Sequence, residues 1–348
     1  MKKAIRKYAG VIYIALMSVA VLIVLSCTNE LGQVWTAMRS LDGRWVFAAL
    51  GCIAAYLFLR MAALRHYLIR HGVRISWRTA MGATGVGQFY SAITPSASGG
   101  QPMQVLWLRR RGVPASLGTA CVSAKFLGFQ TAFLILGGVL GLTNWAAVSE
   151  QIYGLRWLVV AGYAVNGGLI VLVMLTLPRA GIVRWLGGWL VRLGAKLHLV
   201  KRPQQVLERF EASFADYRTA LLSLLKTPSD ALVMFGLSLA QVVAYMGVTV
   251  CLYHAFGLSG ASDLWILTLQ TLLFIAAAFV PLPGAAGAQE SGFVVFFRGV
   301  FPEGNLAAAM LCWRFFTYYL LMIAGLAMTA LAGKRKGEDS ETLPDSPE

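Results

Sequence analysis

The sequence predicts an all-α fold, a polytopic membrane helical bundle with six full spans plus two re-entrant broken-helix hairpins that form an inverted repeat. Three observations predict this class. Of the 348 residues, 58% are hydrophobic and only 13% are charged, whereas soluble domains carry about 25% charged residues. Long apolar runs recur along the chain. Two Gly- and Pro-containing segments between these runs resemble each other.

Six apolar runs are near or above the roughly 20 residues that a helix needs to cross the bilayer core. They comprise residues 10–27, 45–64, 115–143, 157–177, 230–256 and 306–331. We expect a single transmembrane domain over residues 1–332 and a disordered, acidic cytoplasmic tail over 333–348. Residues 178–229 repeat an amphipathic pattern between two spans, which predicts a cytoplasmic segment on the membrane surface.

The net charge of +15 is explained by membrane topology rather than by nucleic-acid binding. With the N-terminus inside, 24 of the 30 Lys and Arg residues fall in cytoplasmic segments and four in exterior ones. This asymmetry follows the positive-inside rule. We therefore expect a multi-pass protein of the cell membrane with both termini in the cytoplasm, whose partners are membrane phospholipids.

The cysteines and known motifs indicate neither a metal site nor a cofactor. All five cysteines lie in or beside apolar segments and form no CxxC spacing, so we expect core residues rather than disulfides. The sequence also lacks GxSxG, HExxH and Walker A motifs. The N-terminus resembles a signal sequence, which either stays as an uncleaved first span, the commoner case, or is cleaved at Cys27.

An internal repeat is the most informative feature of the chain. Residues 95–114 align with residues 283–302 at a constant offset of 188, with six identical pairs among twenty. By the charge rule, a first hairpin over 79–111 enters from the cytoplasm and returns there. A second hairpin over 264–300 enters from the exterior. The hairpins would then point at each other from opposite leaflets, as in many transporters. The alternative is that one or both segments simply span the membrane.

The loops of the two hairpins are candidate headgroup-binding elements. Non-helical backbone at membrane depth must be buried in protein or line a wet cavity. The small loop residues are Ser96, Ser98, Gly99 and Gly100 in the first copy and Gly284 and Gly287 in the second. Helices that begin near Gln101 and Gln289 would present free N–H groups, which attract anions. The alternative is a tight turn between packed helices.

Three ionisable residues fall within predicted membrane segments, namely Lys125, Glu290 and Arg314. A charge at the centre of a spanning helix costs at least about 2.5–3.5 kcal/mol and usually faces a partner or a polar cavity. One interpretation is a headgroup site of net charge +1, in which the cations hold a phosphodiester and Glu290 attracts a cationic headgroup. The other is a structural ion pair, with Glu290 neutralised by Arg314 or Lys125. Outside this group, Arg109, Arg110 and Arg111 are predicted to face lipid phosphates in the cytoplasm.

Two runs resemble the lysylphosphatidylglycerol synthase transmembrane family, also called flippase-like. The first extends from Ile93 to Pro114, and the second from Pro283 to Glu290 with the later segment Arg314 to Tyr319. The likeness covers roughly residues 10–332. The family includes the membrane part of the multiple peptide resistance factor, which moves lysylphosphatidylglycerol outward, while a separate cytosolic domain transfers lysine from lysyl-tRNA. Family members often carry a basic residue where this chain has Gln289.

The resemblance implies a phospholipid flippase or lipid-handling protein for lysylphosphatidylglycerol or a related anionic phospholipid, contributing to membrane charge and cationic peptide resistance. A second implication is phosphatidylglycerol lysyltransferase activity, of which this chain would be only the membrane part. We expect no aminoacyl-transferase domain in this chain, so a separate polypeptide would complete that enzyme. A small-solute transporter is the third possibility. The residues leave the lipid, the transport direction, the energy source and the oligomeric state open.

Overall fold

The computed structural model describes residues 36–333, apart from residues 37, 227 and 279 and most of the stretch 177–202. The described elements are α3 (Gly43–Arg70), α4 (Trp77–Ile93), α5 (Gly100–Arg109), α6 (Ala115–Thr143), α7 (Trp145–Gln151), η1 (Tyr153–Leu155), α8 (Arg156–Thr176), α10 (Pro203–Lys226), α11 (Pro228–Ala255), α12 (Asp263–Ala277), α13 (Ala288–Phe296), α14 (Glu303–Arg314), η2 (Phe315–Leu320) and α15 (Leu321–Gly333). All are helical, which confirms the all-α class. The first predicted span, the Cys27 cleavage site and the tail from residue 334 lie outside the described residues.

Five helical stretches are long and apolar enough to cross a membrane, and they match the second to sixth predicted spans. They are Gly43–Arg70, Ala115–Thr143, Tyr153–Leu175, Pro228–Ala255 and Glu303–Gly333. The most apolar window of Tyr153–Leu175 is only 6% buried, and large side chains such as Trp157 and Leu172 point outward. Such a broad exposed apolar surface marks a membrane interaction site. The described chain is therefore a polytopic membrane bundle.

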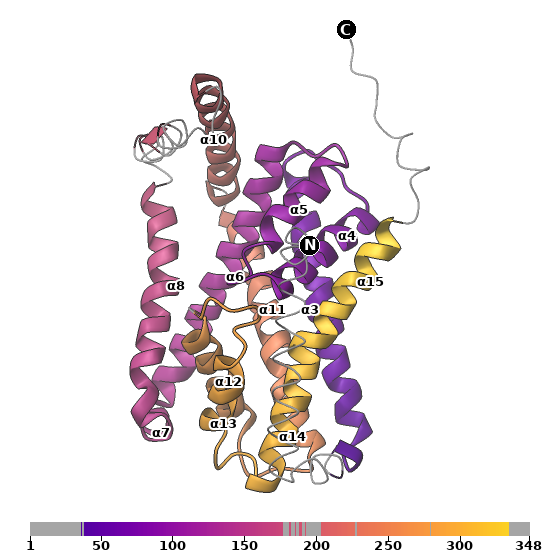
Figure 1. Cartoon of the computed structure of the whole chain (residues 1–348), viewed down its shortest axis with the longest axis vertical. Coiled ribbons are helices and arrows are strands. Elements are labelled where there is room, and N and C mark those ends of the chain that lie inside the picture. The colour runs from indigo at the N-terminus through magenta and orange to yellow at the C-terminus, as the bar shows by residue number, and fades with distance from the viewer. Residues whose placement is uncertain are drawn as a thin grey trace, which may run out of the picture.

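Two hairpins of shorter helices lie between the long ones. α4 packs on α5, and α12 packs on α13. In Figure 1 the first hairpin occupies the upper half of the bundle and the second the lower half. Each hairpin leads into a long helix at the same offset, because α6 starts directly after Pro114 and α14 directly after Pro302. The sequence repeat is thus a repeat of hairpin plus long helix.

The first helix of each hairpin begins with a serine N-cap. The Ser76 side chain accepts the N–H of Thr79 at 3.1 Å at the start of α4. The Ser262 side chain accepts the N–H of Trp265 at 3.2 Å at the start of α12. A serine at this position satisfies one of the free N–H groups of the first helical turn. The two helices therefore start within three residues of the predicted hairpin boundaries at 79 and 264.

Close backbone contacts fix each hairpin against a long helical segment. α4 crosses α15 at Gly85, where an added Cβ would lie 2.7 Å from the carbonyl oxygen of Gly325. α12 approaches α8 at Gly162, where an added Cβ would lie 2.2 Å from the carbonyl oxygen of Ile275. Small residues permit such approaches between membrane helices. These contacts determine where the two hairpin loops lie.

The predicted amphipathic segment over 178–229 is described mainly as α10. This helix packs along α6 and α11, at the end of the bundle drawn uppermost in Figure 1. Its Leu221 is fully buried, and Tyr217 packs against the same cluster. The apolar face of the helix thus covers the ends of two spans. The cytoplasmic location of the segment stays a prediction.

Candidate functional site

The two repeated loops share a left-handed turn directly after the proline, although the later pair Gly99 and Gly287 differs in φ (-79° and 86°). Ser96 and Ala97 have φ angles of 50° and 53°, and their equivalents Gly284 and Ala285 have φ angles of 61° and 47°. Residues other than glycine seldom adopt this left-handed region, which costs of order 1–3 kcal/mol for each residue. Three of the four residues are not glycine. The repeat therefore preserves a strained turn, and such turns cluster at functional sites.

The tips of the two hairpins touch. Pro95 and Pro283, which are equivalent in the repeat, pair in an isolated antiparallel bridge. In each loop the carbonyl of this proline also accepts the N–H three residues later, at 3.1 Å from Ser98 and at 3.2 Å from Ala286. A contact between equivalent residues is what we expect of two repeated hairpins whose tips meet. Their re-entrant placement in a bilayer stays a prediction.

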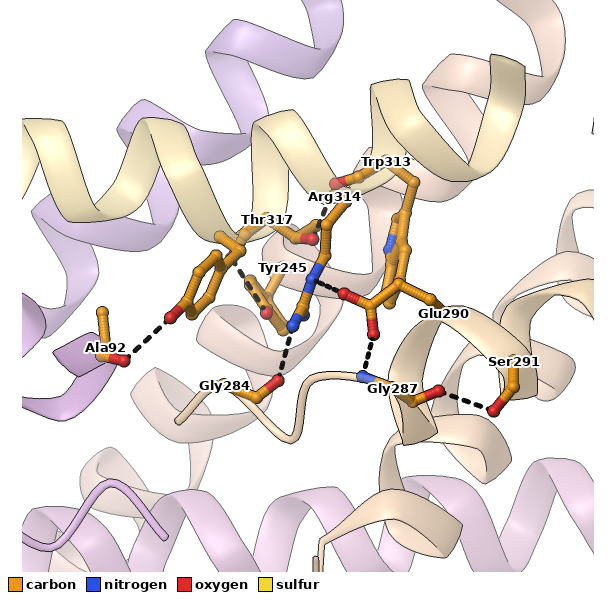
Figure 2. A network of polar contacts seen from close by, with 10 residues as sticks. Ala92, Tyr245, Gly284, Gly287, Glu290, Ser291, Trp313, Arg314 and Thr317 are labelled. Atoms are coloured by element: carbon orange, nitrogen blue, oxygen red, sulfur yellow. Dashed lines mark hydrogen bonds and ion pairs between the residues drawn. The ribbon is translucent and has the colours of Figure 1, made fainter. Parts of the chain in front are cut away.

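A buried ion pair holds the second loop. The Arg314 Nε atom lies 2.6 Å from Glu290 Oε1, and the two side chains are only 7% and 16% exposed. Arg314 Nη2 also donates to the Gly284 carbonyl at 2.7 Å, while Glu290 Oε2 accepts the Gly287 N–H at 2.7 Å. Figure 2 shows both side chains directed at this loop. Because each bond involves a charged group, together they are a strong constraint on the loop.

Tyr318 connects the same guanidinium to the first hairpin. The Arg314 guanidinium carbon lies 4.4 Å from the centre of the Tyr318 ring, and the Tyr318 hydroxyl donates to the Ala92 carbonyl near the end of α4 at 2.9 Å. Gly284 makes room for this ring, since an added Cβ would lie 2.2 Å from it. Tyr318 belongs to the π-helix η2, which follows Arg314. π-Helical segments are rare and frequent at functional sites.

Lys125 aligns with Arg314 after a one-residue slip in the repeat, but it has a different partner. Its side chain is 5% exposed, and Nζ donates to Gln104 Oε1 on α5 at 3.0 Å. The Gln104 amide fills the space over Gly87, where an added Cβ would lie 1.7 Å from Nε2. Among the ion pairs of the described residues, none joins Lys125 to Glu290. The structure therefore places the three predicted membrane charges in two groups rather than in one.

Arg60, which the charge rule counts among the 24 cytoplasmic cations, is a further cation that contacts the bundle interior. Its Nη1 atom donates to the Tyr56 hydroxyl at 2.7 Å. The Tyr56 ring packs against Tyr245 with 5.0 Å between ring centres, and the Tyr245 hydroxyl donates to the Thr317 carbonyl at 3.2 Å. One signal was available in the sequence, because Arg60 lies inside the apolar run 45–64.

The remaining predicted loop residues differ in exposure. Gly100 and Gln289 are buried, Gly99 and Gln101 are half-buried, and Ser96, Ser98 and Gly287 are exposed. An added Cβ at Gly100 would lie 1.9 Å from Ser91 Oγ, so the first hairpin needs glycine there for packing. The buried Oε1 atom of Gln289 has no hydrogen-bond partner in the described part of the chain.

Three predicted phosphate-facing arginines lie away from these loops. Arg109 and Arg110 are exposed, and Arg111 is half-buried with its guanidinium carbon 3.5 Å from the centre of the Trp107 ring system. They are at the far end of the ten-residue helix α5, about 15 Å along the helix from the loop. These arginines therefore lie at the end of the bundle and not at the contact between the two hairpin loops.

The bundle interior carries an excess of positive charge, divided between two groups. Arg60, Lys125 and Arg314 face the interior, and Glu290 is the carboxylate that pairs with one of them. No cluster of three or more metal-ligating side chains occurs among the described residues. Cations with planar or multiple N–H donors bind phosphate through charge-assisted hydrogen bonds. The arrangement can therefore bind a phosphate group inside the bundle.

Comparisons with known proteins agree with the resemblance read from the two loop motifs. The sequence matches the family described as lysylphosphatidylglycerol synthase TM region over residues 10–325. It is also 24% identical over 321 residues to a UPF0104 membrane protein of Archaeoglobus fulgidus, an alignment that covers 89% of this chain and 93% of that protein. The family match includes both hairpins and all the membrane charges described above.

Proposed function

Because the chain belongs to the lysylphosphatidylglycerol synthase transmembrane family, we propose that it moves a phospholipid, lysylphosphatidylglycerol or a related anionic lipid, between the leaflets of the cell membrane. One observation carries this proposal. The loops of two opposed hairpins touch at Pro95 and Pro283, beside a buried guanidinium that already holds one of them. A headgroup that crosses the bilayer has to pass a protein region of this kind, because hydrocarbon cannot solvate it.

The chemistry of Arg314 suits a phosphodiester. Its guanidinium is planar and always charged, and it can bind phosphate with two parallel hydrogen bonds. Without lipid, that charge is balanced by Glu290. A lipid that carries both a phosphate and an ammonium can exchange partners with this pair, phosphate to Arg314 and ammonium to Glu290. The exchange leaves no buried charge unpaired, and so avoids the large cost of an unpaired buried charge.

Transport of labelled lipids in proteoliposomes tests the proposal. Phosphatidylglycerol and lysylphosphatidylglycerol with a fluorescent acyl chain are reconstituted with the purified chain, and an impermeant quencher reports the outward movement of the inner pool. We expect Arg314→Gln to reduce transport to the protein-free rate. The matched control is Arg298→Gln, since Arg298 is exposed beyond the end of α13. Unchanged transport by a folded Arg314→Gln protein would contradict the proposal.

The exchange of partners makes a further distinction between lipids. Glu290→Gln removes the partner of the lysyl ammonium but leaves the guanidinium for the phosphate. We expect this variant to lose more transport of lysylphosphatidylglycerol than of phosphatidylglycerol. Equal losses for both lipids would show that Glu290 does not bind the lysyl group.

The family description, which names a synthase, favours a second candidate function. In this alternative the chain is the membrane part of a phosphatidylglycerol lysyltransferase, and a separate aminoacyl-transferase polypeptide supplies the transfer. We expect the purified chain alone to form no lysylphosphatidylglycerol from lysyl-tRNA and phosphatidylglycerol. Product formation by the chain alone, measured by thin-layer chromatography, would instead assign the complete reaction to it.

A further inference from the structure

Arg60 and Lys125 lie at the same depth on two packed helices. Arg60 is ten residues before the end of α3, and Lys125 is ten residues after the start of α6. These two helix ends are at the same end of the bundle (Figure 1). At 1.5 Å per residue, each charge is about 15 Å from that end. One turn away on the two helices, Leu64 and Cys121 belong to the same buried cluster.

The two cations form a group without a counter-ion in the described chain. Arg60 donates to a phenol, that of Tyr56, and Lys125 donates to an amide, that of Gln104. The Nε atom of Arg60 is buried without a hydrogen-bond partner among the described residues. No ion pair of the described residues contains either cation. Like charges on two packed helices repel each other, and an anion bound between them offsets this repulsion.

This group is separate from Arg314 yet connected to it. Arg314 is eleven residues from the opposite end of the bundle, at the start of α14, which is about 16 Å. Since the 29 residues of α6 are about 43 Å long, roughly 12 Å along the bundle separates the two levels. Tyr245 bridges them, because its ring packs on Tyr56 and its hydroxyl donates to the carbonyl of Thr317, three residues after Arg314.

We propose that Arg60 and Lys125 form a second anion site, which binds a phosphate group one step away from the Arg314–Glu290 pair. Tyr56 and Gln104 orient the two cations, and Gly87 leaves the space in which the Gln104 amide lies. If the proposed function holds, the phosphate belongs to a phospholipid. Free inorganic phosphate presents the same chemistry. The site lies toward the end that the charge rule predicts to be cytoplasmic, so a lipid of the inner leaflet would reach it first.

Ligand-dependent melting of the purified full-length chain in detergent tests this site. The probes are inorganic phosphate, short-chain phosphatidylglycerol and short-chain diacylglycerol, which has no phosphate. For the wild type we expect both phosphate-containing probes, or phosphatidylglycerol alone if the site requires a lipid, to raise the melting temperature, and diacylglycerol to have no effect. No shift with any phosphate-containing probe would overturn the proposal without the need for a variant.

Variants then assign the binding to the two cations. Lys125→Met and Arg60→Gln are each expected to weaken binding by about tenfold or more, the loss for one charge-assisted hydrogen bond. Arg60→Lys keeps the charge and is expected to bind with an intermediate affinity. The matched control is Arg70→Gln, because Arg70 lies on the same helix as Arg60 and forms a partly exposed ion pair with Asp230. This variant is expected to bind like the wild type. Wild-type affinity in a folded Lys125→Met protein would overturn the proposal.

Arg314→Gln in the same assay separates this inference from the proposed function. Binding that depends on Arg60 and Lys125, combined with no lipid transport by wild-type proteoliposomes, would support the anion site and reject the flippase. Binding that depends on Arg314 alone, combined with lipid transport, would reject the second anion site and retain the flippase.

Discussion

Removing the carboxylate of Glu290 should destabilise the protein strongly. The Glu290→Gln variant leaves Arg314, only 7% exposed, without a counter-ion. Breaking a buried ion pair from one side costs about 3–5 kcal/mol. Arg314 keeps its bond to the Gly284 carbonyl and its contact with the Tyr318 ring, and Glu290 is itself 16% exposed. We therefore expect the lower end of that range, about 3 kcal/mol.

The double variant Glu290→Gln/Arg314→Gln separates stability from transport. Replacing both charges leaves none unpaired, so the free energy of unfolding should recover to within about 1 kcal/mol of the wild-type value. Unfolding by sodium dodecyl sulfate in mixed micelles, followed by circular dichroism, measures it. Lipid transport should stay absent in the double variant, because no guanidinium remains for the phosphate. Transport that returns together with stability would refute the headgroup role and leave the pair as scaffolding.

Two further predictions concern the second loop and the topology. Gly284→Ala combines a positive φ with a Cβ 2.2 Å from the Tyr318 ring. We therefore expect it to lower the free energy of unfolding by at least about 1–3 kcal/mol and to reduce lipid transport. Gly304→Ala, where an added Cβ meets open space, is the control and should change neither quantity. In a background without native cysteines, Glu150→Cys should react with an impermeant thiol reagent added outside the cell and Ser76→Cys should not, because the positive-inside rule places them on opposite sides. Exterior labelling at position 76 would contradict the predicted entry of the first hairpin from the cytoplasm.

The long apolar helices and the repeat could be predicted from the sequence because each depends on a local signal. A span requires only about 20 apolar residues, and the repeat keeps six identities at one offset. The similar φ angles of 50° at Ser96 and 61° at Gly284 show that the offset also holds for the backbone at the start of the loop. A serine in that conformation could not be predicted, since the region is uncommon for residues other than glycine.

The grouping of the charges could be predicted only in part. The alignment of Lys125 with Arg314 in the repeat indicated equivalent places, and the structure has them on equivalent helices, each bonded to the second helix of its own hairpin. The partner of each cation depends on which neighbouring side chain is directed toward it by tertiary packing. Gly87 leaves room for Gln104 beside Lys125, and no charge pattern in the sequence signals this contact. The bond of Arg60 to Tyr56 is a local contact between residues four apart on α3, but the packing of Tyr56 on Tyr245 is tertiary and could not be predicted.

A reversible crosslink between the two loops tests most directly whether lipid headgroups pass between them. In an antiparallel bridge such as that of Pro95 and Pro283, the Cα atoms are about 4.5–5.5 Å apart, within the roughly 4.4–6.8 Å that a disulfide spans. The variant Pro95→Cys/Pro283→Cys, in a background whose native cysteines are alanine, is oxidised and reduced in proteoliposomes, with each single variant as control. The account predicts that oxidation stops lipid transport and that a thiol reductant restores it. A fully crosslinked protein that transports lipid at the reduced protein's rate would contradict it.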